Sequence, residues 1–266
     1  MHRGCKLILV EGLCGTGKST LAERLHHHLA QREIPSKFYD EGAEQHPTSL
    51  NWHALFPDEE YRKLLTRYPD AASHIRSLAI ENGDSYLVPY RGVEEFSKRD
   101  ALYAELKAHE LCWTDSPTAT LSEFTCSIKR QWARFTESAS TAETLYVLEA
   151  VFFQHQIHDL LRHYQASDIQ IQEHIQGIAN QLAPLNPVLI YLNQPSVRDQ
   201  QVWISFMRSK PHFATEQNIR FMENRKRLEL KLLHRLCFPS YVIENTNLNW
   251  DDVFGQMKEV LGLSAS

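Results

Sequence analysis

The sequence predicts an α/β fold, and three features support this prediction. Short apolar runs that are typical of buried strands recur at residues 7–10, 145–149, 187–192 and 240–244. Longer stretches with apolar residues at helical spacing separate them. A glycine-rich loop joins the first apolar run to the first helical stretch, so the chain passes there from strand to loop to helix.

This loop matches the phosphate-binding pattern G-x-x-x-x-G-K-[ST] in the strand–loop–helix setting that the pattern requires. An ordinary glycine-rich turn before a helix is the alternative, and the strand and helix on either side argue against it. We expect Lys18 to reach the β- and γ-phosphates of a nucleotide and Ser19 to hold Mg²⁺ through its hydroxyl. The residues expected to bind the nucleotide here are Gly12, Cys14, Gly15, Thr16, Gly17, Lys18, Ser19 and Thr20.

Length and composition exclude several other classes of protein. The chain has 266 residues and a formal net charge of −5, which argues against non-specific binding of nucleic acid. Its apolar runs are too short for a signal peptide or for a membrane span of about 20 residues. Five scattered cysteines without CxxC spacing are typical of reduced thiols, so we expect a cytoplasmic protein. The sequence leaves open whether the protein forms a homodimer.

The first helix is expected over residues 17–31 and a second strand over residues 36–40. Ligands of α/β sheets gather at the carboxyl ends of the strands. Asp40, Glu41 and His46 lie at or just after the end of this strand, so we expect them to contact the phosphate acceptor. A polar loop with a helix cap is the alternative for the same residues.

Residues 51–144 show helical patterns, at 59–68, 71–81, 93–109 and 120–138, and no clear parallel strand. This stretch is far longer than an ordinary connection between parallel strands. We therefore expect a mostly helical, substrate-binding insert over residues 51–144, with residues 1–50 and 145–266 forming the core. Mixed aromatic and basic residues suit a pocket that stacks a ring, while the alternative for each aromatic is a place in the core. The pocket candidates are Arg91, Trp132 and Arg134.

The apolar run at residues 145–149 ends in Glu149. In a domain with a phosphate-binding loop, such a strand lies beside the first one, with its last carboxylate near the metal and the γ-phosphate. We expect Glu149 to help hold Mg²⁺ or to act as the base for an attacking hydroxyl. The alternative is that Glu149 caps the helix that starts near Val151. His155 and His158 follow at i, i+3 spacing, but no third metal ligand accompanies them.

A basic segment follows the fourth strand. A helix is expected from Ser196 to about Met207, and Pro211 separates it from the next helical run. Arg208 and Lys210 at this break are expected to form a mobile flap that neutralises the transferring phosphoryl group. Basic residues continue along the next helix, and some of them are expected on its solvated face, paired with Glu223 or Glu229: Arg220, Arg225, Lys226 and Arg227.

Together these features resemble the thymidylate kinase branch of the P-loop nucleoside and nucleotide kinases. The similarity rests on Val10-Glu11-Gly12 before a GxGKST loop, on the strand at Tyr191-Leu192 with its helix and basic segment, and on a closing strand that turns at Asn245-Thr246-Asn247. It covers the core and implies a five-stranded parallel sheet with the P-loop strand in the middle. It also implies ATP as donor, Mg²⁺, a lid that carries arginines, and adenine packed near Asn245 and Asn247.

The chain departs from the thymidylate kinase pattern in three places. Glu149-Ala150 replaces the Asp-Arg pair after the central strand, Glu41-Gly42 replaces the Glu-Pro after the second strand, and the insert has no counterpart. The expected function is an ATP-dependent phosphotransferase whose acceptor is a nucleoside, a nucleotide, a sugar or an antibiotic-like alcohol. The alternative is an ATP-hydrolysing regulatory or assembly module without a small-molecule acceptor. A GTPase is not expected, because residues 245–248 lack the lysine and the acid of the guanine-reading motif.

Overall fold

The computed structural model describes residues 4–246 and 249–264. The chain divides into two compact units. The core unit consists of Met1–His46, Trp132–His158 and Ser167–Ser266, and the insert unit consists of Pro47–Gln131 and Asp159–Ala166. The insert was expected over residues 51–144, and these bounds stay a prediction. In the division into compact units, residues 132–144 belong to the core unit.

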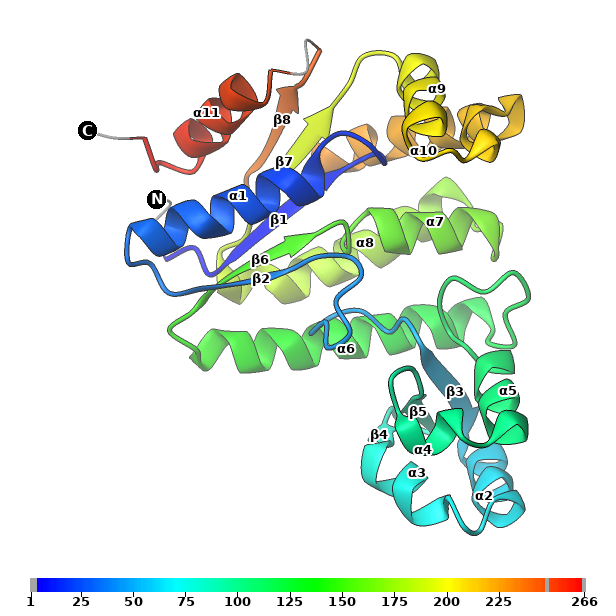
Figure 1. Cartoon of the computed structure of the whole chain (residues 1–266). Coiled ribbons are helices and arrows are strands. Elements are labelled where there is room, and N and C mark those ends of the chain that lie inside the picture. The colour runs from blue at the N-terminus through cyan, green and yellow to red at the C-terminus, as the bar shows by residue number, and fades with distance from the viewer. Residues whose placement is uncertain (1–3, 247–248, 265–266) are drawn as a thin grey trace. The chain divides into compact units, whose positions relative to one another are not determined.

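The core unit contains a five-stranded parallel sheet (Figure 1). Its strands lie in the order β2 (Ser36–Tyr39), β6 (Leu145–Glu149), β1 (Leu7–Gly12), β7 (Val188–Asn193) and β8 (Ser240–Glu244). All four pairings are parallel. The predicted fold class is therefore confirmed, with the strand that precedes the glycine-rich loop in the middle of the sheet.

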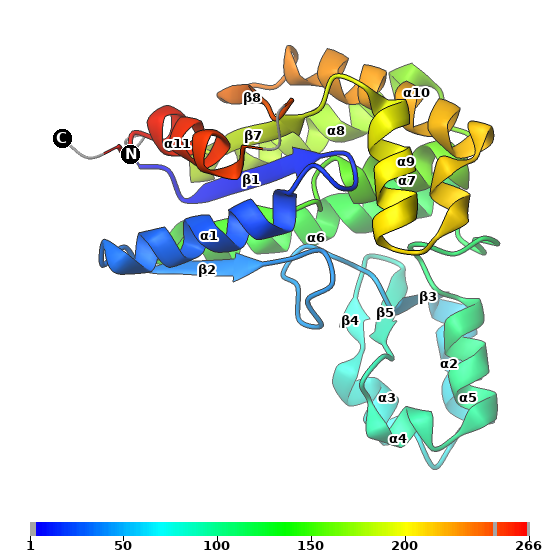
Figure 2. The ribbon, with the colours of Figure 1, turned by 45° about the horizontal axis from the view of Figure 1, so that its top comes forward.

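Helices cover both faces of this sheet (Figure 2). α1 (Lys18–Gln31) and α11 (Trp250–Val260) pack on one face, where their leucines and valines join one face of the strands in a common core. α10 (Glu216–Leu233) lies on the other face beside α8 (Asp168–Leu182), as the hydrogen bond from the Tyr191 hydroxyl of β7 to Glu229 of α10 shows. Burial on both faces explains why the central strands are continuous apolar runs and not alternating ones.

The remaining elements of the core carry or support the candidate site. α9 (Val197–Met207) follows β7, and a 3₁₀ helix, η2 (Pro211–Ala214), leads from it into α10. A second 3₁₀ helix, η1 (Ala183–Leu185), precedes β7. Two helices have residues in both units. α6 (Leu121–Thr141) begins in the insert unit and ends in the core unit, and α7 (Gln154–Arg162) begins in the core unit and ends in the insert unit.

The insert unit contains a three-stranded antiparallel sheet in addition to its helices. The strands β3 (His53–Pro57), β5 (Ser85–Pro89) and β4 (Ile80–Glu81) lie in that order. The helices are α2 (Asp58–Arg67), α3 (Ala72–Leu78), α4 (Glu94–Ser97) and α5 (Asp100–Ala108). Sequence analysis missed the strands, and the helix expected over residues 71–81 is wrong at its end, because the chain leaves α3 at Leu78 and continues into β4.

The helix expected over residues 93–109 is two helices, α4 and α5. The insert unit has its own apolar core, in which Tyr61 and Tyr86 stack with ring centroids 4.0 Å apart. Within the described residues, none of the helices combines the length and the apolar character that crossing a membrane demands.

Candidate active site

The glycine-rich loop lies at the carboxyl end of β1 and leads into α1. Gly17 has φ 86° and caps α1, and a Cβ atom there would lie 2.0 Å from the Trp250 ring. Only glycine fits that position without strain. No acidic side chain occupies the first turn of α1 and no side chain caps it, so its N–H groups are available to an anion.

Lys18 begins α1 directly after this loop, and its charge lies near Glu149. Its side chain is almost fully buried, its Nζ donates a hydrogen bond to the Leu13 carbonyl at 3.0 Å, and it lies 3.8 Å from Glu149 Oε1. The Lys18 side chain thus folds back and contacts the backbone of its own loop. A phosphate that enters the loop can replace the Leu13 carbonyl as the partner of this ammonium group.

Glu149 ends β6 beside β1, as the sequence predicted for this strand. Its carboxylate is buried, accepts the backbone N–H of Glu41 at 3.2 Å and is hydrogen-bonded to Ser19. Burial raises the pKa of Glu149, the nearby Glu41 raises it further, and Lys18 lowers it. Two oxygen donors, Ser19 and Glu149, therefore meet at the start of α1, which is the donor chemistry that Mg²⁺ prefers.

Glu11, rather than Glu149, accepts the N–H groups of the turn between β6 and α7. Its Oε1 accepts from the Phe152 N–H at 2.7 Å and its Oε2 accepts from the Gln154 N–H at 3.3 Å. The interpretation of Glu149 as the cap of this helix is therefore wrong. Burial, opposed by these hydrogen bonds, raises the pKa of Glu11 to about 8.

Sequence analysis did not assign Glu11 a role in the site. The signal that could have found it is an acid directly before the loop, at the end of a strand with no exposed residue. A buried carboxylate needs hydrogen-bond donors, and the backbone of a neighbouring turn is a common source of them.

A chain of polar side chains, buried except for Glu41 at its end, connects α10 with the loop after β2. Arg225 forms an ion pair with Glu229 at 2.7 Å, and its Nη2 lies 3.5 Å from Gln154 Oε1. Gln154 Nε2 in turn donates to Glu41 Oε2. Arg225 was grouped with residues on a solvated helix face; its pairing with Glu229 is confirmed, but both side chains are buried, because α10 lays this face on the sheet.

A cavity of about 240 Å³ opens over the loop and the start of α1. The carboxyl ends of β2 and β6 contribute acids, α9 contributes apolar residues, the residue after α9 is an arginine, and α11 contributes an aromatic ring. The side chains that line it include Cys14, Lys18, Ser19, Thr20, Glu41, Glu149, Gln154, Trp203, Ile204, Met207, Arg208 and Trp250.

α9 packs directly on the glycine-rich loop. Gln200 Nε2 donates to the Cys14 carbonyl at 2.7 Å, and a Cβ atom at Gly15 would lie 2.4 Å from Ile204 Cδ1. Trp203 and Met207 of this helix reach the cavity although they are 42% and 60% exposed, and sequence analysis missed both. The sequence feature that could have identified them is a pair of large apolar side chains one helical turn apart, directly before the basic segment.

The two cations expected in a flap occupy different positions. Arg208 follows α9 directly and lines the cavity. Lys210 is exposed, is not among the lining residues, and leads into η2. The catalytic assignments of both residues stay predictions.

The residues expected near adenine are described in part. Asn245 is buried, donates its backbone N–H to the Asn193 carbonyl at 2.9 Å, and has a side-chain amide without a hydrogen-bond partner in the described part of the chain. Asn247 lies outside the described residues. Trp250, three residues farther on, is the aromatic ring that packs on Gly17.

Besides Glu41, two acceptor-binding residues were expected after β2, Asp40 and His46. Asp40 is exposed and accepts the Gly42 N–H at 2.9 Å in a local turn. His46 is buried edge-on against Tyr39, and burial lowers the pKa of His46 to about 3, so its ring is neutral. These assignments stay predictions.

Trp132, which was offered as a pocket residue, has no exposed surface and packs edge-on against Phe135 and Phe152. The structure therefore fits its alternative, a place in the core, because an enclosed ring cannot contact a ligand. Arg134 is half-buried in the core unit. Arg91 belongs to the insert unit, where its guanidinium lies 3.8 Å from the centroid of the Trp52 ring.

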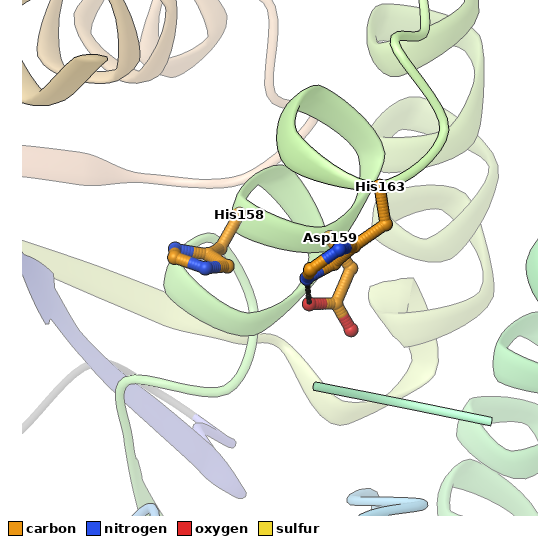
Figure 3. Close-up of side chains that lie close together, drawn as sticks. All are labelled: His158, Asp159 and His163. Carbon is orange, nitrogen blue, oxygen red and sulfur yellow. Dashed lines mark ion pairs between the residues drawn. The ribbon is translucent and has the colours of Figure 1, made fainter. Parts of the chain in front are cut away.

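Acid and histidine side chains also gather along α7 and just after it (Figure 3). One ligand atom each of His158, Asp159 and His163 lies within 4.8 Å of the others, and His163 Nε2 is 3.7 Å from Asp159 Oδ1. Two imidazole nitrogens and a carboxylate oxygen are ligand types that bind zinc, so the structure brings two further candidate ligands to His158. His155 is not part of this group.

Comparison with known proteins yielded structural neighbours but no sequence relatives. No family model and no curated protein matches the chain. Among solved structures it is similar to thymidylate kinase from Candida albicans, with a TM-score of 0.48 and 12% identity, over 97% of this chain and 91% of that one. It is also similar to thymidylate kinase from Ehrlichia chaffeensis, with a TM-score of 0.44 and 11% identity, over 97% of this chain and 99% of that one. Neither likeness is close enough to assign a function.

Proposed function

We propose that this protein is an ATP-dependent phosphotransferase. It moves the γ-phosphate of ATP to a hydroxyl or a phosphate group of a small-molecule acceptor, such as a nucleoside, a nucleotide or an antibiotic-like alcohol. The observation that carries the proposal is the meeting of a glycine-rich loop, Lys18, Ser19 and Glu149 in one cavity, at the adjacent ends of two parallel strands. Loop, cation and acid are the parts that phosphoryl transfer requires.

The side chains present suit a magnesium ion. The Ser19 hydroxyl would hold Mg²⁺, which supplies charge neutralisation at the phosphates when bound, and the Glu149 carboxylate would either help to hold this ion or act as a base. Protein groups would bind the phosphate oxygens. The loop amides and the first turn of α1 bind the phosphate oxygens, and Lys18 exchanges the Leu13 carbonyl for them.

In the second role, Glu149 would accept the proton of an alcohol acceptor. Burial raises the pKa of this carboxylate, which makes it a stronger base than an exposed glutamate. Arg208 at the end of α9 supports charge that develops on the transferring group. The apolar side chains of α9 over the loop limit the access of water, so ATP is protected until an acceptor binds.

The test is Lys18→Ala, with Lys37→Ala as the matched control because Lys37 is exposed on β2. ADP formation is measured with ATP, Mg²⁺ and a protein-free small-molecule extract as the source of acceptor. Removal of one charged donor from a transition-state site costs on the order of 10²- to 10³-fold in rate, so Lys18→Ala should lose that much while its circular dichroism spectrum is kept. Full activity in folded Lys18→Ala would refute the proposal. ADP formation that does not depend on the extract would indicate the ATP-hydrolysing module instead.

A further inference from the structure

We propose that His158, Asp159 and His163 form a binding site for a zinc ion, separate from the residues that line the cavity over the glycine-rich loop. Two imidazole nitrogens and one carboxylate oxygen are a ligand set that zinc accepts in proteins. All three residues belong to one short stretch of chain, α7 and the residue that follows it, so their spacing is set locally (Figure 3). The site does not depend on the proposed phosphotransferase activity.

Asp159 gives this group a buried carboxylate. Its side chain is 3% exposed, and its Oδ1 has no hydrogen-bond partner in the part of the chain that the structure describes. Within residues 4–246 and 249–264, no lysine or arginine forms an ion pair with Asp159, and its acidic group pairs with His163 alone, at 3.7 Å. Buried carboxylates in proteins are paired with a cation or coordinate a metal ion. A zinc ion between Asp159 and the two histidines would supply that cation.

The backbone of Trp113 fixes the orientation of this carboxylate. Its N–H donates to Asp159 Oδ2 at 3.1 Å, which leaves Oδ1 as the oxygen that faces His163. A ligating carboxylate is commonly held in this way by a hydrogen bond to its other oxygen. Trp113 reaches Asp159 from a backbone conformation with φ 58°, which bulky residues rarely adopt. Such strain is frequent at functional sites, where the surrounding structure maintains it.

The two histidines differ in how they reach the carboxylate. His163 follows Asp159 by four residues, so both lie on the same face at the end of α7, and Figure 3 shows them joined as an ion pair. His158 stands beside this pair, and its ring packs edge-on against Phe221 with centroids 5.3 Å apart. Zinc lies about 2.0–2.1 Å from imidazole nitrogens. We therefore expect a bound ion to draw the three donor atoms closer together than their present 4.8 Å, by rotation of the side chains.

The ligand types distinguish this site from the magnesium site proposed in the cavity. Mg²⁺ and Ca²⁺ take oxygen ligands, whereas imidazole nitrogens suit zinc and other transition metals. Three protein ligands leave the fourth position of a tetrahedral zinc ion to water or another small ligand. Zinc bound to Asp159 and His163 would tie together the last turn of α7 and the residue after it. The ion would thereby stabilise the folded chain, because the unfolded chain has no preformed site.

The experiment is a calorimetric titration of Zn²⁺ into the full-length protein, stripped of metal with a chelator and free of any polyhistidine tag. Excess Mg²⁺ is present to compete for the oxygen ligands of the cavity. Loss of a residue that merely orients a metal ligand costs about 10- to 100-fold in affinity, so loss of a ligand should cost at least about 100-fold. We expect that loss in Asp159→Asn and in His163→Ala. The matched controls are Asp70→Asn and His27→Ala, which alter exposed side chains and should bind zinc like the wild type.

Thermal unfolding followed by circular dichroism separates loss of the site from loss of the fold. Asp159→Asn keeps an oxygen that can accept the Trp113 N–H, so this variant should fold and decides the question by itself. Zn²⁺ should raise the unfolding temperature of the wild type and of His27→Ala but not that of Asp159→Asn. No binding to the wild type, or equal affinity in the wild type and Asp159→Asn, would overturn the inference. Neither measurement involves ATP or an acceptor, so such a result would leave the proposed function standing.

Discussion

Glu11 offers a direct test of how the site is held together. Its carboxyl group lies under the glycine-rich loop with no exposed surface and receives the N–H groups of Phe152 and Gln154. It thereby anchors the turn that directly follows Glu149. The perturbation is Glu11→Gln, which keeps the size of the side chain and removes its ionisation.

The expected magnitude follows from the pKa of Glu11, which burial raises from 4.5 to about 8. The folded protein therefore holds this proton over a pH range in which the unfolded chain releases it. The resulting stability is fully present below pH 4.5 and is lost as the pH rises through 8. One pH unit in this window corresponds to about 1.4 kcal/mol, so the free energy of unfolding should fall by about 2.7 kcal/mol between pH 5.5 and 7.5, relative to Glu11→Gln.

The assay is urea unfolding of both proteins, followed by circular dichroism at half-unit steps of pH. The quantity of interest is the wild-type free energy of unfolding minus that of Glu11→Gln, because pH effects from other groups cancel in this difference. Glu23→Gln, which removes an exposed carboxylate on α1, controls for the substitution itself. A difference that stays flat from pH 5.5 to 7.5 would show that Glu11 is ionised in the folded protein and would refute the reasoning.

Three further predictions concern the cavity. Glu149→Gln should leave ATP binding nearly intact in calorimetry and lower the single-turnover rate on the order of 10²- to 10⁴-fold with an alcohol acceptor; an unchanged rate would remove Glu149 from the chemistry. Gly17→Ala should lose at least about 1–2 kcal/mol of stability and alter Trp250 fluorescence, because its φ is 86° and its Cβ would lie 2.0 Å from that ring, and wild-type stability would contradict this. ATP with Mg²⁺ should slow alkylation of Cys14, measured by mass spectrometry with the exposed Cys126 as internal reference, and equal rates would place Cys14 outside the nucleotide site.

The elements whose signals are local were predicted well. The strands at residues 145–149 and 240–244 have the bounds expected from their apolar runs, and α1 begins one residue from its predicted start. The insert was predicted less well. β4 is two residues long, and β3 and β5 are half-buried edge and centre strands of a small antiparallel sheet, so none of them leaves a long apolar run to detect.

The site was predicted where its residues are close in the sequence and missed where they are not. Lys18 and Ser19 belong to one motif, whereas Trp203 and Trp250 reach the cavity from helices that follow other strands. Arg225 illustrates the second case. Its spacing to Glu229 is that of an ordinary exposed ion pair, and nothing in those five residues indicates that α10 presents this pair to the sheet.

Sequence alone was enough to locate the glycine-rich loop and to predict a parallel sheet around it. Glycine positions, helix starts and buried strands depend on neighbouring residues, so they can be recognised without knowing the fold. Tertiary structure decided which acids face the loop: Glu41 and Glu149 are 108 residues apart and meet only because β2 and β6 pair in parallel and end together. It also decided that Glu11 is buried among backbone donors, since a carboxylate takes its pKa from the desolvation and the hydrogen bonds that packing imposes.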